Sequence, residues 1–113
     1  MKYAMKLQPS PFERIKSGKK TIELRLYDEK RRKIQPGDEI EFTNAETGET
    51  ISTTVVDLFV FDSFSDLYKS LPLDSCGYSE SEIATASPED MSVYYSEDEQ
   101  KKYGVVGIKI ALL

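Results

Sequence analysis

Apolar and polar residues alternate in several short segments of this chain, and this pattern constrains its fold more than any other feature. A period of two is typical of a β-strand with one buried face. In the longest segment the alternation slips at Val55-Val56, which predicts a β-bulge. The closing segment is apolar enough for a central strand. The predicted strands are residues 2–7, 20–27, 39–43, 50–61 and 105–113.

Short helices are predicted between these strands. Ser10–Glu13 has the form of a capping box, and Gly18 can end the helix that follows. Residues 73–87 have little periodicity and are predicted to form a loop or an insertion. Further helix starts are predicted where a serine precedes an acidic first turn, at Ser63, Ser87 and Ser96.

The order of these elements predicts the fold class α+β, mainly β. The chain lacks the strand-helix alternation of a parallel βαβ fold. We therefore expect a small, largely antiparallel β-barrel of about five to six strands, with short helices packed on one side. The length of 113 residues fits a single domain, residues 1–113.

The composition excludes several kinds of site. The chain has no histidine, so Ser-His and Cys-His nucleophiles and His-ligated zinc are ruled out. Its one cysteine, Cys76, cannot form an internal disulfide. No metal or cofactor is expected. The opening residues lack the apolar run of a signal peptide, and no segment reaches the ~20 apolar residues of a membrane span. We therefore expect a cytoplasmic protein without membrane contact.

Charge is divided unevenly along the chain. The formal net charge is −5, but residues 1–35 hold 11 basic and 4 acidic side chains, whereas residues 36–113 hold 4 and 16. Affinity for a nucleic-acid backbone comes from clustered Lys and Arg. The acidic remainder disfavours unaided binding to long nucleic acid, so we expect a local basic cleft for a short or single-nucleotide ligand.

One predicted strand carries a polar row behind its apolar row. Thr21, Glu23 and Arg25 share a face, with successive side chains about 6–7 Å apart, and Lys20 lies at the start of the strand. The row is either an exposed charge ladder or the lining of a pocket. In a pocket, Lys20 and Arg25 would bind a phosphate or carbonyl oxygen. Glu23 would accept hydrogen bonds or act as a general base.

Other residues carry weaker signals. The basic run Lys30–Lys33 is either a phosphate contact or a solvated loop. Tyr94, Tyr95 and Tyr103 are either core residues or stacking platforms for an unpaired base. Cys76 lies in a predicted loop without a neighbouring base, so no activated thiol is expected.

The segment Gly18-x-Lys20-x-x-Glu23-x-Arg25 resembles the G-x-K-x-x-E-x-R signature of the ASCH domain family, a branch of the PUA-like β-barrels. The turn at Pro36-Gly37-Asp38 and the closing strand after Tyr103 also lie where a small stand-alone ASCH domain has them. The resemblance implies a PUA-like barrel with a cleft between barrel and helices, lined by residues 18–25.

The resemblance also implies a choice of functions. The family is regarded as RNA-binding, some bacterial members act as ribonucleases, and one small group deacetylates N4-acetylcytidine. In that group a Lys, a Thr three residues later and an acid after the central helix serve catalysis. Lys20 matches the Lys and Asp74 lies in the region of the acid, but Glu23 stands at the Thr position. Thr21 is a nearby hydroxyl at a different position, so the same deacetylation is not implied.

We therefore expect a cleft that binds RNA, a nucleotide or a modified nucleoside through Lys20, Thr21, Glu23 and Arg25. One alternative is a hydrolase, either a ribonuclease or an amidohydrolase, with Lys20, Glu23 and Asp74 as candidate catalytic residues. A cleft too closed for a polynucleotide, together with a raised pKa of Glu23, would favour it. The other alternative is a protein-interaction module without a small ligand, which an exposed Glu23 and Arg25 would favour. The oligomeric state stays open.

Overall fold

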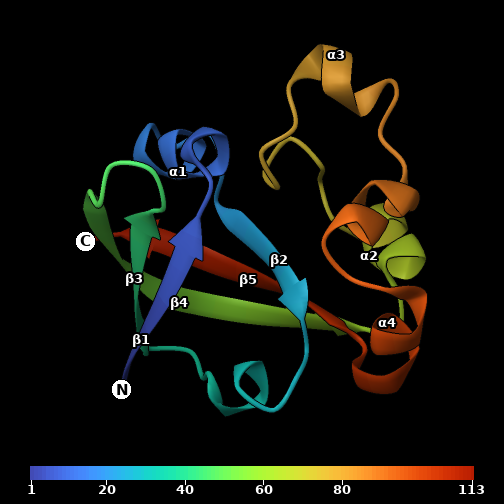
Figure 1. Cartoon of the computed structure of the whole chain (residues 1–113), viewed down its shortest axis with the longest axis horizontal. Coiled ribbons are helices and arrows are strands. Elements are labelled where there is room, and N and C mark those ends of the chain that lie inside the picture. The colour runs from blue at the N-terminus through green and yellow to red at the C-terminus, as the bar shows by residue number, and fades with distance from the viewer.

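The computed structural model describes residues 1–113 as one five-stranded sheet with short helices (Figure 1). The first half of the chain contains β1 (Lys2–Leu7), α1 (Pro9–Lys16), β2 (Ile22–Leu26), the 3-10 helix η1 (Arg31–Lys33), β3 (Glu39–Asn44) and β4 (Thr50–Phe61). The second half contains α2 (Phe64–Ser70), α3 (Glu80–Ile83), the 3-10 helix η2 (Pro88–Val93), α4 (Glu97–Tyr103) and β5 (Val105–Leu112). None of these helices is long and apolar enough to cross a membrane.

The sheet is curled into a half-barrel whose two outer strands are β1 and β2. Its strand order is β1-β3-β4-β5-β2, with β1 parallel to β3 and the other pairs antiparallel. The predicted class, mainly β with a largely antiparallel barrel, is confirmed. The parallel pairing of β1 with β3 was not predicted, because alternation indicates which face of a strand is buried but not which way the strand runs.

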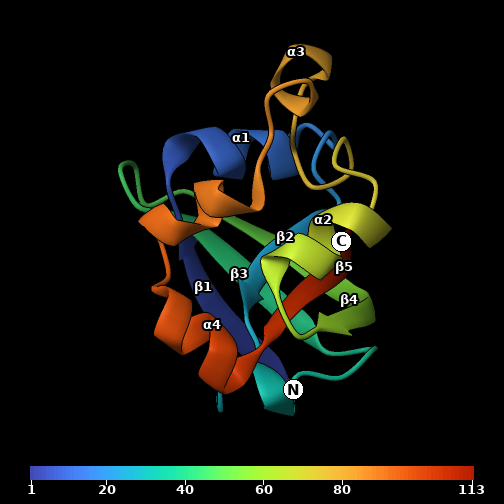
Figure 2. The ribbon, with the colours of Figure 1, turned by 90° about the vertical axis from the view of Figure 1, so that its right-hand side faces the viewer.

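Two apolar clusters lie on opposite faces of the sheet. One fills the half-barrel and includes Phe12 and Ile15 of α1, which covers one end. The other joins the apolar row of β2 to Phe64 and Leu67 of α2. Figure 2 shows α2 and α4 in front of the sheet and α3 above it. The helices therefore cover the outer face of β2 and leave the gap between β1 and β2 open.

Local sequence signals explain most of the element boundaries. The predicted bulge in β4 is present, as a register shift between Val55 and Asp57. The side chain of Ser63 accepts a hydrogen bond from the Asp66 main chain at 3.2 Å and caps α2. Ser87 and Ser96 cap η2 and α4 in the same way.

Two predictions on the helices are wrong. Ser10 does not cap α1, because the helix begins one residue earlier, at Pro9, and Ser10 lies inside it. Proline at the first helical position has its φ already fixed for a helix, so Pro9 starts the helix before Ser10 can. The predicted loop at residues 73–87 also contains α3, a four-residue helix capped by Ser79. It buries no residue, so it left no periodicity in the sequence.

Candidate functional site

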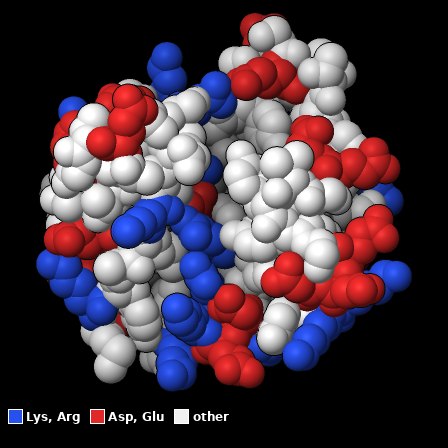
Figure 3. Space-filling view, viewed as in Figure 1, with Lys and Arg blue, Asp and Glu red and all other residues white.

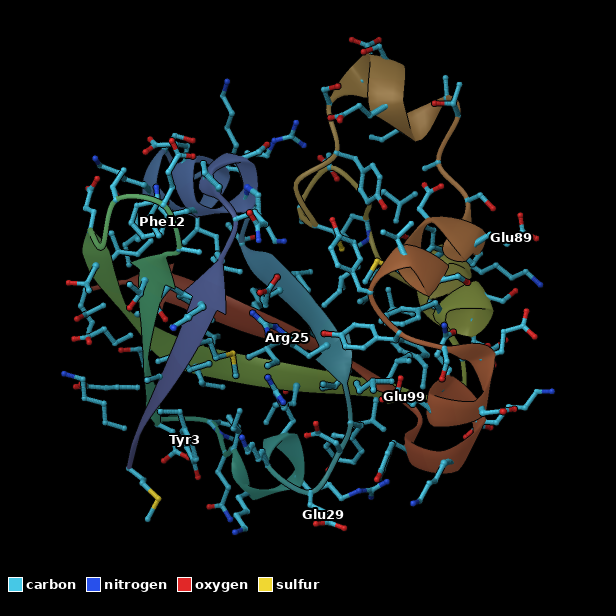
Figure 4. All side chains as sticks on the ribbon, viewed as in Figure 1. Tyr3, Phe12, Arg25, Glu29, Glu89 and Glu99 are labelled. Atoms are coloured by element: carbon cyan, nitrogen blue, oxygen red, sulfur yellow. The ribbon has the colours of Figure 1, made fainter.

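The polar row of β2 faces the opening of the half-barrel. Glu23 pairs with Ile108 and Arg25 with Val106 of β5, and residues opposite each other in a sheet point to the same face. Because β2 is an outer strand, this face is bordered by the gap beside β1. Figure 4 shows Arg25 within that gap, between β1 and β2. The polar row therefore lies at the mouth of the half-barrel, behind the apolar row that packs on the helices.

Glu23 is a buried carboxylate shared by two cations. Its exposed fraction is 3%. Lys20 Nζ lies 2.8 Å from its Oε1, and Arg25 donates through Nε and Nη2 to its Oε2 at 3.1 and 3.0 Å. The main-chain N–H of Leu24 donates to Oε1 at 3.2 Å. These four contacts occupy the roughly four acceptor positions of a carboxylate. The exposed charge ladder considered from the sequence is therefore not what the chain forms.

The two cations keep Glu23 ionised. Burial raises the pKa of Glu23, but Lys20 and Arg25 lower it by more, so that it lies below its ordinary value. Burial also lowers the pKa of Arg25, while Glu23 and the nearby Tyr95 hydroxyl raise it, with a net increase. The pKa of Glu23 thus shifts in the direction opposite to the one that would favour a hydrolase.

A pocket of about 500 Å³ opens over this group. Its walls come from β1, α1, β2, residues 76–78, α3 and η2, and Figure 3 shows a hollow on this face between the barrel side and the helical side. Four cations and two carboxylates line it, which gives a net charge of +2 within a chain of net −5. The charged lining residues are Lys6, Arg14, Lys20, Arg25, Glu23 and Glu82.

The segment after α2 lies on the start of β2 and fixes Lys20 in place. The Ser75 carbonyl accepts hydrogen bonds from the main chain of Thr21 and Ile22 at 2.8 and 3.0 Å. Gly77 has a φ of +101°, and a Cβ there would lie 3.0 Å from Cδ of Lys20. The main chain therefore lies so close to the Lys20 stem that a Cβ at position 77 would displace the lysine side chain by a few tenths of an ångström.

Arg14 connects α1 to α3 across the pocket. Its Nη1 and Nη2 donate to the two carboxylate oxygens of Glu82 at 2.9 and 3.3 Å, and Nη1 also donates to the carbonyl of Gly77. Hydrogen bonds from Ser79, followed by that from Arg14, lower the pKa of Glu82 to about 2. We call this arrangement the Arg14–Glu82 strap.

The structure brings three of the predicted site residues together and leaves two apart. Lys20, Glu23 and Arg25 line the pocket. Thr21 is half-buried and does not line it, and Asp74 is exposed on the loop after α2 and does not line it either. The proposed roles of Thr21 and Asp74 in a site therefore have no support in the geometry.

The basic run lies outside the pocket and makes local contacts. Arg31 forms an ion pair with Asp28 at 2.9 Å. Arg32 donates to the carbonyl of Tyr103 at 2.9 Å, and its guanidinium lies 4.4 Å from the ring centre of Tyr27. These contacts show that part of the run has a structural role.

The aromatic candidates divide between the pocket and the core. Tyr94 and Tyr95 line the pocket, and Tyr94 is 67% exposed. Tyr95 stacks on Phe64 with ring centres 6.1 Å apart, whereas Tyr103 packs against the outer apolar cluster. Cys76 also lines the pocket, but burial raises its pKa to about 11, as expected for a thiol that is not activated.

Lys6, Arg14 and Glu82 line the pocket but were not among the residues predicted from the sequence. The Ser79-x-x-Glu82 spacing is a capping-box signal and would have located α3 and the carboxylate. No comparable signal marks Arg14, since basic residues near the end of a helix are usually solvent-exposed. No group of three or more His, Cys, Asp or Glu side chains is placed to hold a metal ion.

The family model for the ASCH domain matches residues 5–113. The chain belongs to the ASCH domain family. The match covers the Gly18-to-Arg25 motif on which the resemblance was based, and it confirms the family predicted from the sequence. Lys20, Glu23 and Arg25, which lie within the matched range, are the charged centre of the pocket.

Solved structures share the fold of this chain. The hypothetical protein PH0355 is 38% identical over the full length of both chains, with a TM-score of 0.82. Protein PF0455 from Pyrococcus furiosus is 39% identical, over 100% of this chain and 98% of that one, with a TM-score of 0.72. An ASCH structure from Zymomonas mobilis shares the fold at 17% identity, over 96% of this chain and 65% of that one, with a TM-score of 0.64. No curated protein matches the chain.

Proposed function

We propose that this ASCH domain binds single-stranded RNA or a nucleotide in the pocket along β2. The proposal rests on one observation: the carboxylate oxygens of Glu23 already accept from neighbouring groups of the protein. Its acceptor positions are taken by Lys20, Arg25 and Leu24, so Glu23 holds the two cations in place and does not itself accept from a ligand. The ligand then meets cationic donors, which suit phosphate and carbonyl oxygens.

Both cations keep donors for a ligand. The Lys20 ammonium has three N–H groups, and Glu23 is its one charged partner. Arg25 uses Nε and Nη2 for Glu23 and Lys6, so Nη1 is the nitrogen that faces a ligand, with the Tyr95 hydroxyl close to the guanidinium. A phosphate oxygen that enters the pocket can therefore bind either cation without breaking the contacts that hold it.

An exposed aromatic ring at the same pocket suits a nucleobase. Tyr94 lies beside Tyr95, with ring centres 6.4 Å apart and planes tilted by 51°. Unpaired bases stack on exposed aromatic side chains in many RNA-binding proteins. A pocket of about 500 Å³ lies in the usual size range of small-ligand sites. The proposal includes the cytoplasmic location predicted from the sequence, because RNA and free nucleotides are present there.

Binding is better supported than either alternative. A general base needs a free lone pair within reach of its substrate, and the hydrogen bonds and ion pair of Glu23 occupy its acceptor positions. A protein-interaction surface would favour exposed charges on a flat sheet face. Glu23 is instead buried, and the Arg25 side chain is 16% exposed.

Titration of a short, fluorescently labelled single-stranded RNA tests the proposal. We expect binding by the wild type and a loss of at least about tenfold in affinity for Lys20→Ala and for Arg25→Ala, since each removes a charged hydrogen bond worth about 1.5–3 kcal/mol. Lys19→Ala is the matched control, because Lys19 is the exposed neighbour outside the pocket. Equal affinities for wild type and both pocket variants, or no binding at all, would remove the proposal.

A further inference from the structure

We propose that the pocket selects a phosphomonoester, the doubly charged terminal phosphate of a nucleoside monophosphate or of an RNA end, over the singly charged phosphodiester inside a chain. This inference rests on the proposed function and names the ligand class for the same pocket. Three observations carry it: the charge of the lining, the depth of the two cations and the two contacts that border the pocket.

The charge of the lining matches a dianion. The four cations exceed the two carboxylates by two charges, and all four cations come from the first 25 residues. A phosphomonoester carries about −1.5 to −2 charges at pH 7, whereas an internal phosphodiester carries one. A dianion therefore gains about twice the attraction of a monoanion from a lining of net charge +2.

The two central cations lie below the surface. The side chains of Lys20 and Arg25 are 11% and 16% exposed, and they bind opposite oxygens of the Glu23 carboxylate. A phosphate must therefore enter the pocket to reach them. A terminal phosphate has one ester link and can enter with the rest of the molecule behind it. An internal phosphate has two links, and both strands would have to fit into the pocket.

Contacts border the pocket on two sides. The Arg14–Glu82 strap joins α1 to α3. On another side, Arg25 Nη2 donates to the Lys6 carbonyl at 3.1 Å and joins β2 to β1. A polynucleotide that ran between α1 and α3, or between β1 and β2, would have to break one of these contacts, whereas a chain end that enters from the mouth of the pocket leaves both in place.

The two carboxylates, the thiol and two of the tyrosines of the pocket have pKa values displaced away from about 6, which is the second pKa of a phosphomonoester. The chain has no histidine. The pKa values of Glu23 and Glu82 lie below their ordinary range, and those of Cys76, Tyr78 and Tyr95 lie above theirs. The remaining charged residues that line the pocket are Lys6, Arg14, Lys20 and Arg25. The pH dependence of binding between pH 5 and 8 should therefore report the ligand.

The test compares ligands on the full-length wild-type chain by calorimetry and by competition. The free ligands are nucleoside 5′- and 3′-monophosphates, the matching nucleosides, and dinucleoside monophosphates, which contain only a phosphodiester. The RNA ligands are one hexamer sequence with a 5′-phosphate, a 3′-phosphate or hydroxyls at both ends. We expect the terminal phosphate to raise affinity at least about tenfold at pH 7.5, and this advantage to shrink as the pH falls from 7 to 5.

The same measurements distinguish a phosphate at the end of an RNA from the phosphate of a free nucleotide. A phosphorylated hexamer that binds more tightly than its monophosphate indicates an RNA end, and equal affinities indicate a free nucleotide. Either result supports the selection of a phosphomonoester. Because these comparisons use one protein, they do not depend on whether a pocket variant folds.

The result that overturns the inference differs from the one that overturns the proposed function. If the hexamers with and without a terminal phosphate bind equally, and Lys20→Ala weakens both, the pocket binds RNA without selecting an end. If the advantage of the phosphate does not change between pH 7 and 5, the second charge is not recognised. If no ligand binds at pH 7.5, the proposed function fails together with the inference.

Discussion

Arg25 on β2 donates through Nη2 to the main-chain carbonyl of Lys6 on β1, at 3.1 Å. These two strands share no main-chain pairing, because each pairs only with its inner neighbour in the sheet. The same guanidinium donates twice to the buried Glu23. One side chain therefore links the open edges of the half-barrel and holds the carboxylate at the centre of the pocket.

Replacement of Arg25 by alanine should destabilise the fold as well as weaken binding. It removes the link between β1 and β2 and leaves Glu23 with Lys20 as its one cation. Removal of one partner of a buried ion pair costs about 3–5 kcal/mol. We expect Arg25→Ala to lower the free energy of unfolding in urea by about 3 kcal/mol. Arg25→Lys should lose less, because it keeps the charge but not the forked contact.

Lys30→Ala is the control for this measurement. Lys30 is an exposed cation whose side chain makes no ion pair or hydrogen bond in the structure. Its replacement should leave the urea midpoint unchanged within error. An Arg25→Ala variant as stable as Lys30→Ala would contradict a structural role for the bond between Arg25 and Lys6.

The stability of the domain should fall in acid. Glu23 and Glu82 both have pKa values lowered in the folded state from an ordinary value of 4.5, that of Glu82 to about 2. A group with a lowered folded-state pKa contributes stability above its unfolded pKa, and this contribution is lost as the pH falls toward the folded value. Urea unfolding at pH 7, 5, 4 and 3 should show that the free energy of unfolding declines below about pH 4.5.

Glu23→Gln should lower the free energy of unfolding at pH 7 and should also make its decline with falling pH less steep. The amide is neutral and has one oxygen and one NH2 group, so one of the two cations meets N–H donors. The variant should therefore lose about 3 kcal/mol at pH 7. It should also decline less steeply than wild type between pH 5 and 3, since its buried carboxylate is gone. A variant with the wild-type slope would show that Glu23 contributes nothing to the acid sensitivity.

The Arg14–Glu82 strap should control the local stability of α3 more than that of the whole fold. The paired side chains are 36% and 43% exposed, and exposed ion pairs contribute about 0–1 kcal/mol. No residue of α3 is buried. Glu82→Gln should therefore leave the urea midpoint nearly unchanged but speed up amide hydrogen exchange in residues 79–86.

Another ion pair of α1 provides the control for the strap. Lys16 pairs with Glu49 at 2.6 Å. These two side chains are 47% and 42% exposed, which is similar to the exposure of Arg14 and Glu82. Glu49→Gln removes a comparable contact far from α3 along the chain. Hydrogen exchange at residues 79–86 that rises equally in both variants would show that the strap has no specific effect on α3.

The sequence predicted the strands and most caps well because those signals are local. The bulge at Val55 and the cap at Ser63 depend on neighbours in the chain, and each was recognisable from a few residues. The parallel pairing of β1 with β3 depends on strands far apart in sequence, so no local pattern predicted it. The same holds for the strap, whose partners are separated by 68 positions.

The sequence predicted which residues form the candidate site, but it did not predict that Glu23 is buried. Alternation placed Glu23 and Arg25 on one polar face with Lys20 at the start of the strand, and the family motif contained all three residues. That Glu23 is buried depends on Lys20 and Arg25 folding onto it and on residues 75–77 covering the start of the strand. Such burial arises from tertiary contacts, which a polar position in a strand pattern does not reveal.

Cys76 should react slowly in the native protein. Burial raises its pKa from 9.0 to about 11, and the thiolate is the reactive form of a cysteine. The shift of about two pKa units reduces the thiolate fraction at pH 8 by about a hundredfold. Alkylation with iodoacetamide should therefore be at least that much slower in buffer than in urea. Similar rates in the two conditions would contradict the burial of this thiol.

Gly77→Ala should disturb the pocket, whereas Gly48→Ala should not. Both glycines have positive φ values, +101° and +78°, and an alanine in the left-handed region costs about 1–2 kcal/mol. The environments differ, because a Cβ at Gly77 would lie 3.0 Å from Cδ of Lys20, whereas nothing lies within 4 Å at Gly48. Lys20 must then shift, which weakens its contact with Glu23. We expect both variants to lose a similar amount of stability from backbone strain, but only Gly77→Ala to lose affinity for the RNA probe. Equal affinities for the two variants would show that the close approach of Gly77 does not position Lys20.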